Sequence, residues 1–357
     1  MVRIAHISDS HLGSSLFQLV ERREDARRCL QKAVDMAMRH SPDILVHTGD
    51  LFDTPFPTYE DTNFAIDLLK NVNDKAIVVV LHGNHDVPYG YHHAQSPLWM
   101  LENTGLFIST GESDVRDIAM EVDGKHVQMH LISWTRNRSF ERYMSEMETQ
   151  GAITLLFSHD LSLPADEMPA RYDYIGYGHA HTFRLDEEYA IGRPGSTCVV
   201  DWKREMNGTR KLIIADIDAN GIEFSTEKLN DVREFKFHTG LDITGMNSEE
   251  ANAAIKSWLN GLSPRKKGKP IIIVNVNGIV DLETESGIER NGLIEFGESQ
   301  LNPLFLHIEP NWQVVGPDSV ELSAPLNVET SLKEYLSHMK YKDSDRVLSE
   351  LNKIGGI

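Results

Sequence analysis

The sequence predicts a layered α/β fold for roughly its first two thirds, followed by a second, smaller α/β domain. Short apolar runs of strand length alternate there with segments whose apolar residues recur at helical spacing. Several of these runs end in Asp, His or Asn. Ligand-binding residues of an open α/β sheet typically lie at this point, beyond the carboxyl ends of the strands.

The predicted elements of the first part follow one another in a strand–helix–strand order. The first strand spans residues 2–7, and the first helix spans residues 24–39 and ends before Pro42. The later elements are a strand at 44–46, a helix at 62–70, and strands at 77–81, 131–133, 153–157 and 174–177. This β-α-β order is typical of a layered α/β domain.

The pattern changes near residue 232. A helix is predicted over residues 247–260, with strands at 271–276 and 304–308. Beyond residue 327, apolar residues form two further helical stripes. We therefore expect three parts: residues 1–232, a small α/β domain over residues 233–326, and a C-terminal helical segment over residues 327–357.

The composition is that of a soluble globular protein, with 40% hydrophobic and 25% charged residues. Two cysteines cannot build a disulfide framework or a CxxC zinc site, so we expect a cytoplasmic protein. We find no signal-peptide pattern and no apolar run that could span a membrane. The net charge of −19 opposes nucleic-acid binding. Carboxylates that bind metal ions are, however, neutralised once those ions are in place.

Five apolar runs lead directly into residue types that bind metals. These residues are Asp9 with His11, Asp50, Asn84 beside His85, His159, and His179 with His181. We expect the five segments to meet at one edge of the fold, because they lie at strand ends. Oxygen and imidazole ligands without thiolate favour manganese, iron or zinc over calcium. Two such ions sharing a carboxylate can neutralise phosphoryl oxygens, so the pattern predicts displacement at phosphorus.

The motifs DSH, GD, GNHD, SHD and GHAH, in this order, resemble those of the calcineurin-like metallophosphoesterases. The resemblance implies a layered α-β-β-α sandwich with two divalent metal ions. Asp9, His11, Asp50 and His181 would bind one ion. Asp50, Asn84, His159 and His179 would bind the other. His85 would be the catalytic general acid, and Asp53 would orient it.

The segments GDLFDTPFPT, GHAHTF and RPGST are similar to those of DNA double-strand-break repair nucleases of the SbcD and Mre-eleven (meiotic recombination) type. This resemblance implies a manganese-dependent (Mn2+) hydrolase acting on DNA as a 3′-to-5′ exonuclease and a single-strand endonuclease. It also implies a homodimer with an SMC-like coiled-coil ABC ATPase as partner, and no membrane association. No P-loop motif occurs in the chain, so an ATPase would be a separate protein.

Two other functions remain open from the sequence, namely a phosphodiesterase acting on small nucleotides and a non-catalytic interaction module. The basic loop at residues 263–270 is either a DNA contact or a solvated turn. Residues Arg193–Ser196 match a loop that lies beside the metals in the family that the sequence resembles. The four arginines near the start of the first helix are expected to form an exposed face: Arg22, Arg23, Arg27 and Arg28.

Overall fold

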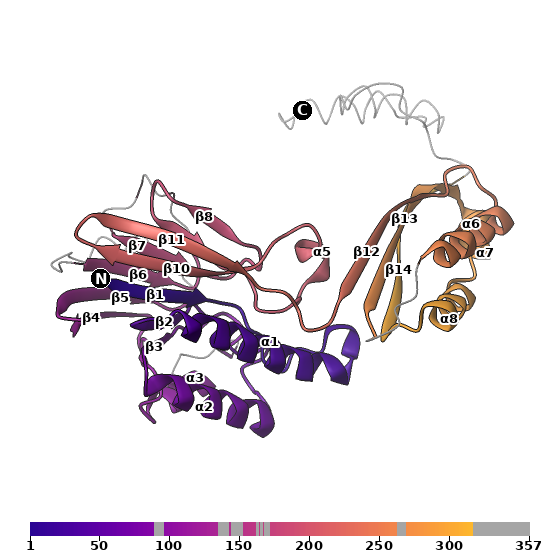
Figure 1. Ribbon diagram of the computed structural model, residues 1–357. Coiled ribbons are helices and arrows are strands. Elements are labelled where there is room, and N and C mark those ends of the chain that lie inside the picture. The colour runs from indigo at the N-terminus through magenta and orange to yellow at the C-terminus, as the bar shows by residue number, and fades with distance from the viewer. Residues whose placement is uncertain are drawn as a thin grey trace, which may run out of the picture. The chain divides into compact units, whose positions relative to one another are not determined.

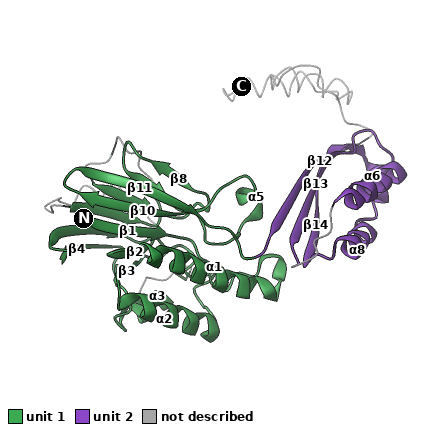
Figure 2. Cartoon of the chain, in the orientation of Figure 1, with its two compact units in different colours: residues 1–232 green, residues 233–357 purple. Residues whose placement is uncertain are grey.

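A computed structural model describes residues 1–88, 96–134, 143, 153–161, 164, 167, 172–262 and 269–316. The chain divides into two compact units, residues 1–232 and 233–357 (Figure 2). The C-terminal helical segment predicted over residues 327–357, and residues 263–268 of the basic loop, lie outside the described residues.

The first unit contains a five-stranded sheet in the order β11-β10-β1-β2-β3 (Figure 1). Its strands are β1 (Val2–Ile7), β2 (Ile44–His47), β3 (Ile77–Val80), β10 (Lys211–Asp218) and β11 (Gly221–Lys228). β1, β2 and β3 run parallel, whereas β10 is antiparallel to β1. The carboxyl ends of the three parallel strands therefore lie at one edge, where the predicted Asp and His residues follow.

A six-stranded sheet of the same unit has the order β4-β5-β6-β7-β9-β8. Its strands are β4 (Val115–Val122), β5 (Lys125–Ile132), β6 (Ile153–Ser158), β7 (Tyr174–Tyr177), β8 (Arg184–Asp186) and β9 (Ile191–Arg193). β5, β6, β7 and β9 are parallel neighbours, so β6 and β7 also end at a common edge, just before His159 and His179.

The two sheets pack face to face through apolar side chains that water does not reach. Ile4 and Val46 of the first sheet join Leu155 and Phe157 of the second in one fully buried cluster. This layer of apolar contacts stabilises the sandwich by removing apolar area from water.

Helices cover the outer face of the five-stranded sheet. They are α1 (Val20–Arg39), α2 (Tyr59–Asn73) and α3 (Pro97–Glu102). The unit also contains the short helices η1 (Leu16–Gln18) and α5 (Trp202–Glu205). Ile7 and Leu45 of the sheet pack against Leu30 and Leu68 of these helices. The predicted α/β class is confirmed.

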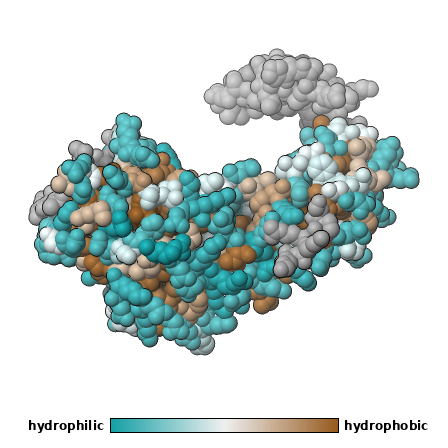
Figure 3. Space-filling model, in the orientation of Figure 1, coloured by the Kyte–Doolittle hydropathy of each residue, from teal (hydrophilic) through white to brown (hydrophobic). Residues whose placement is uncertain are grey.

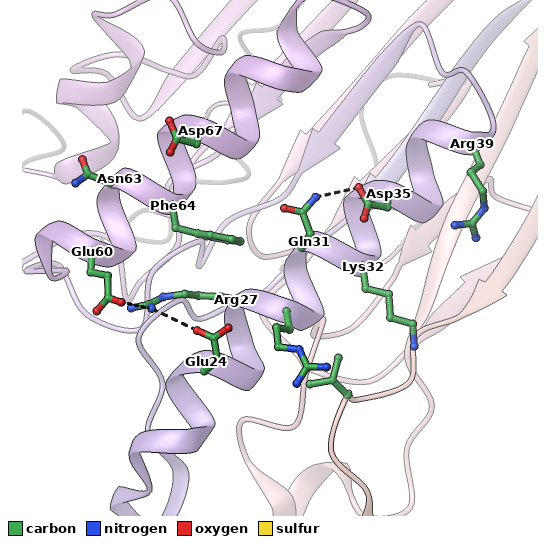
Figure 4. Close-up of a pocket in the computed structure, with 12 residues that line it drawn as sticks. Glu24, Arg27, Gln31, Lys32, Asp35, Arg39, Glu60, Asn63, Phe64 and Asp67 are labelled. Atoms are coloured by element: carbon green, nitrogen blue, oxygen red, sulfur yellow. Dashed lines mark hydrogen bonds and ion pairs between the residues drawn. The ribbon is translucent and has the colours of Figure 1, made fainter. Parts of the chain in front are cut away.

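The expectation that the arginines of α1 form an exposed face is wrong for two of the four. Arg22 is 2% exposed and binds Asp25 and Asp231. Arg27 is mostly buried and reaches α2, where it pairs with Glu60 (Figure 4). It also pairs there with Asp61. These guanidiniums join elements within the unit, because carboxylates stand close enough to satisfy them.

A groove of about 760 Å³ lies over α1 and α2. Its lining mixes both charge signs and includes Glu24, Arg28, Lys32 and Asp67 (Figure 4). The visible surface of residues 1–232 is largely hydrophilic, with scattered hydrophobic residues (Figure 3). None of the predicted metal ligands lines this groove.

The second unit has a parallel sheet in the order β12-β13-β14, with helices packed on one face. Its elements are β12 (Phe235–Asp242), α6 (Ser248–Gly261), β13 (Ile271–Asp281), α7 (Leu282–Gly287), α8 (Arg290–Leu301) and β14 (Phe305–Val315). Among the described residues of the whole chain, no helix is long and apolar enough to cross a membrane.

Candidate metal centre

All seven predicted ligand side chains lie at the carboxyl-edge loops of the two sheets of the first unit. Asp9, His11 and His181 present one ligand atom each within 4.8 Å of one another, and so do Asp50, His159 and His179. The structure therefore brings the sequence-predicted residues together as two neighbouring groups.

Asp50 belongs to the second group and also approaches the first. Its Oδ2 lies 3.6 Å from His11 Nε2 and 3.5 Å from His159 Nε2. One carboxylate oxygen within reach of a ligand nitrogen from each group is the arrangement that a shared, bridging ligand requires.

Asn84 completes the second group. Its Oδ1 lies 3.1 Å from His159 Nε2 and 3.0 Å from His179 Nδ1. Ligand atoms bound at about 2.1 Å to one ion stand about 3.0–3.5 Å apart in octahedral or tetrahedral geometry. The spacing of the side chains thus matches that of atoms around a common cation.

Two buried polar atoms of the first group have no hydrogen-bond partner among the described residues. They are Asp9 Oδ2 and His11 Nε2, and both residues are fully buried. An unpartnered buried carboxylate oxygen is costly unless a cation or a donor satisfies it. The residues therefore fit a metal ion, and their oxygen and nitrogen donors suit a divalent transition metal.

In the metal-free centre, the carboxylates change the pKa of a ligand imidazole. Burial lowers the pKa of His11, but its hydrogen bond to Asp53 and the charges of Asp50 and Asp9 raise that pKa to about 9. A cation that binds His11 must displace this proton.

The backbone at the centre is held in a conformation that L-residues rarely adopt. Four of the seven ligand residues have positive φ angles: Asp9 (51°), His11 (46°), Asp50 (55°) and His179 (69°). Such backbone strain persists where the surrounding structure enforces it, and it concentrates at functional sites.

Three of the ligand histidines have the ring nitrogen away from the centre bound to an acceptor. His159 Nδ1 donates to Thr48 O at 2.8 Å, His11 Nδ1 lies 3.1 Å from Asp53 Oδ1, and His181 Nδ1 lies 3.1 Å from Glu205 Oε1. Contacts of this kind fix the tautomer and the ring orientation of a metal ligand.

His85 lies beside the first group and outside both ligand sets. Its ring centroid is 4.7 Å from that of His11, and its Nδ1 donates to the backbone oxygen of Asp53 at 2.9 Å. The side chain of Asp53 contacts His11 instead of His85. In this structure, Asp53 therefore holds His85 through its main chain and orients His11 through its carboxylate.

The loops that carry Asp50 and Asn84 are joined by a carboxylate whose role the sequence motifs do not reveal. Asp86 is fully buried and accepts hydrogen bonds from the backbone N–H groups of Leu51, Phe52 and Gly83. Gly83 must lack a side chain, because a Cβ there would lie 2.1 Å from Asp50 Oδ1. The motif residues beside the ligands therefore serve packing as well as chemistry.

Other histidines near the centre have structural partners. His6 lies between Tyr174 and Thr48, and His47 contacts Ser10. Burial lowers the pKa of both imidazoles to about 3, so they stay neutral.

Comparison with known proteins gives a consistent family. Residues 2–188 match the calcineurin-like phosphoesterase family. The chain is 30% identical to the DNA double-strand break repair protein Mre11 of Saccharolobus solfataricus, over 59% of this chain and 58% of that protein. It is 28% identical to the protein of that name from Aeropyrum pernix, over 55% and 53% of the two chains.

A third protein of that name, from Methanococcus maripaludis, is 25% identical over 77% of this chain and 78% of its own length. The first two alignments span little more than half of the relatives they match.

Proposed function

This chain belongs to the calcineurin-like phosphoesterase family, and on that premise we propose that it is a two-metal DNA nuclease of double-strand-break repair. The proposal is a phosphodiesterase that acts as a 3′-to-5′ exonuclease and a single-strand endonuclease. The observation that carries the two-metal part is the position of Asp50 between two groups of ligand side chains.

The proximity of the side chains supports the two proposed ligand sets. Asp9, His11, Asp50 and His181 would bind one ion, and Asp50, Asn84, His159 and His179 would bind the other. Manganese is the proposed metal because the motif resemblance implies it. The oxygen and imidazole donors are compatible with manganese, as they are with iron or zinc, and both cysteines are buried in an apolar cluster that contains none of the ligands. When bound, two divalent cations stabilise charge on the phosphoryl oxygens and activate water for attack.

His85 is the proposed general acid. Its Nδ1 is bound to the main chain of Asp53, which leaves Nε2 as the nitrogen that can donate a proton to the departing 3′ oxygen. Asp53 is a positioning residue, since it holds His85 by its backbone and His11 by its carboxylate.

DNA is the proposed substrate because the relatives that the chain resembles are DNA double-strand break repair proteins. A homodimer and an SMC-like coiled-coil ABC ATPase partner belong to the same proposal. The net charge of −19 favours a second function, a phosphodiesterase acting on small nucleotides, because an acidic surface repels a polyanion.

One experiment distinguishes these functions. An end-labelled duplex and a single-stranded DNA circle are incubated with the protein, with its His85→Ser variant, and with manganese, magnesium or chelator. We expect manganese-dependent cleavage that falls by about 10²–10⁴-fold in the variant, the usual contribution of a general acid.

The metal content of both proteins is measured in parallel. A His85→Ser protein that carries its metals and cleaves normally would contradict the role of His85. Hydrolysis of cyclic or linear small nucleotides without cleavage of DNA would select the second function.

A further inference from the structure

Glu205 occupies a fully enclosed position behind the metal ligand His181. It is the last residue of the single-turn helix α5, and it is 5% exposed. Its carboxylate receives contacts from five donors: His181 Nδ1 (3.1 Å), Ser196 Oγ (2.9 Å), Val200 N (2.9 Å), Asp201 N (2.7 Å) and Arg210 Nη1 (3.0 Å). A buried carboxylate is tolerated only when it is paired and hydrogen-bonded in this way.

The donors divide between the two carboxylate oxygens. Oε1 takes the ring of His181 and the two backbone N–H groups, whereas Oε2 takes Ser196 and Arg210. Rotation of the carboxylate would break several of these bonds at once. The oxygen that faces His181 is therefore fixed in place before any metal binds.

The same loop also holds the main chain of His181. Ser196 N donates to His181 O at 3.1 Å, while the hydroxyl proton of Ser196 is shared between Cys198 O at 2.6 Å and Glu205 Oε2 at 2.9 Å. Gly195 has a φ of +81° and leaves no room for a side chain, since a Cβ would lie 2.6 Å from His181 O. His181, Ser196 and Glu205 thus form a closed ring of contacts.

We propose that Glu205 is a positioning residue that holds His181 in the Nδ1–H tautomer and turns its Nε2 toward the candidate metal centre. The metal part of this inference rests on the proposed function. The carboxylate–histidine contact acts on the ring whether or not a metal is present. A carboxylate behind a ligand histidine also raises the basicity of the metal-facing nitrogen, and losing one typically weakens metal affinity by about 10–100-fold.

The structure offers a matched control in Glu102, at the end of α3. Its carboxylate accepts hydrogen bonds from the guanidinium of Arg116 and from the backbone N–H groups of Ser109 and Gly111. The side chain of Glu102 is 12% exposed. No histidine contacts it among the described residues. Loss of Glu102 therefore reproduces the structural cost of losing such a carboxylate without touching the metal centre.

The test compares Glu205→Gln, Glu205→Ala, Glu102→Gln and Glu102→Ala in the full chain. Manganese affinity is measured by titration calorimetry, and unfolding by thermal melting. We expect about 10–100-fold weaker binding of one ion in Glu205→Ala. The manganese affinity of Glu205→Gln should lie between those of the parent and Glu205→Ala, because the amide keeps an acceptor for His181 but loses the charge. Both Glu102 variants should melt earlier yet bind manganese as the parent does.

A second readout requires no metal. Nitrogen-15 NMR of the metal-free protein reports the tautomer of His181, whose signal is assigned by its absence from His181→Asn. We expect Nδ1–H in the parent and in Glu205→Gln. We expect a mixture of tautomers in Glu205→Ala.

Parental manganese affinity in both Glu205 variants, or an unchanged His181 tautomer in Glu205→Ala, would overturn the proposal. If the parent binds no metal, the proposed function fails, and the NMR result still decides whether Glu205 positions His181. If Glu205→Ala does not fold, the calorimetry of Glu205→Gln against Glu102→Gln decides.

Discussion

Replacing Asp86 with alanine should cost far more stability than is usual for an aspartate, because its carboxylate joins the loops that carry Asp50 and Asn84. The side chain is fully buried and accepts three backbone hydrogen bonds, from Phe52 N (2.9 Å), Gly83 N (2.9 Å) and Leu51 N (3.3 Å). Alanine leaves all three N–H groups without this acceptor.

The magnitude follows from the number and length of these bonds. A buried N–H left without a partner costs about 1–3 kcal/mol, and the long bond from Leu51 contributes least, so we expect a loss of about 3–5 kcal/mol. The matched control is Asp173→Ala. Asp173 is exposed and accepts one backbone bond, from Thr154 N at 2.8 Å, so its loss should cost about 0.5–1.5 kcal/mol.

The free energy of unfolding is measured by urea denaturation of the metal-free proteins at pH 5.5 and pH 8. Burial, followed by the charge of Asp50, raises the pKa of Asp86 to about 7. In the unfolded chain the pKa is about 3.9. The folded parent therefore binds more protons between these values, and it gains stability as the pH falls through 7 toward 4. Alanine has no such group, so the difference between parent and variant should be larger at pH 5.5 than at pH 8.

Two results would refute this reasoning. One is a cost for Asp86→Ala that is no larger than the cost for Asp173→Ala. The other is a difference between parent and variant that grows as the pH rises, which would mean that the folded protein prefers the ionised carboxylate.

Two further predictions concern metal binding. Manganese binding at pH 7 should release protons, because the pKa of His11 is raised to about 9 in the metal-free centre, and affinity should rise with pH up to that value. Calorimetry in buffers of different ionisation enthalpy measures this release, and binding that is independent of pH and buffer would contradict it. Gly83→Ala should abolish tight binding of at least one ion, since the new Cβ would lie 2.1 Å from Asp50 Oδ1 and displace that carboxylate. Gly261→Ala, at the end of helix α6 where a Cβ meets no atom within 4 Å, is its control, and equal metal binding by the two variants would refute the steric argument.

The α/β fold could be predicted from the sequence because strand length and helical spacing are local properties. β1 and β7 have the bounds that the pattern predicts, and α1 begins four residues before the expected start at residue 24. The candidate ligands could be predicted for a related reason. Parallel strands bring their carboxyl ends to one edge, so residues far apart in the sequence meet there.

The contacts behind the ligands could not be predicted in the same way. Glu205 lies 24 residues after His181, and their contact depends on the path of the loop at residues 193–201. In the sequence, Arg22 and Arg27 look like part of a solvated helix face. The spacing of residues along the helix does not reveal that Asp231 and Asp61 lie close enough to form ion pairs with them. Partners brought together by loops and by packing between elements leave no periodic signal.

Titration calorimetry with manganese is the most direct test for a centre that holds two metal ions with Asp50 shared between them. Metal-free parent and His179→Ala are titrated under the same conditions. We expect two ions per chain for the parent. We expect one for the variant, because His179 belongs to a single ligand group while the group of Asp9, His11 and His181 stays intact. One ion or none in the parent would contradict it.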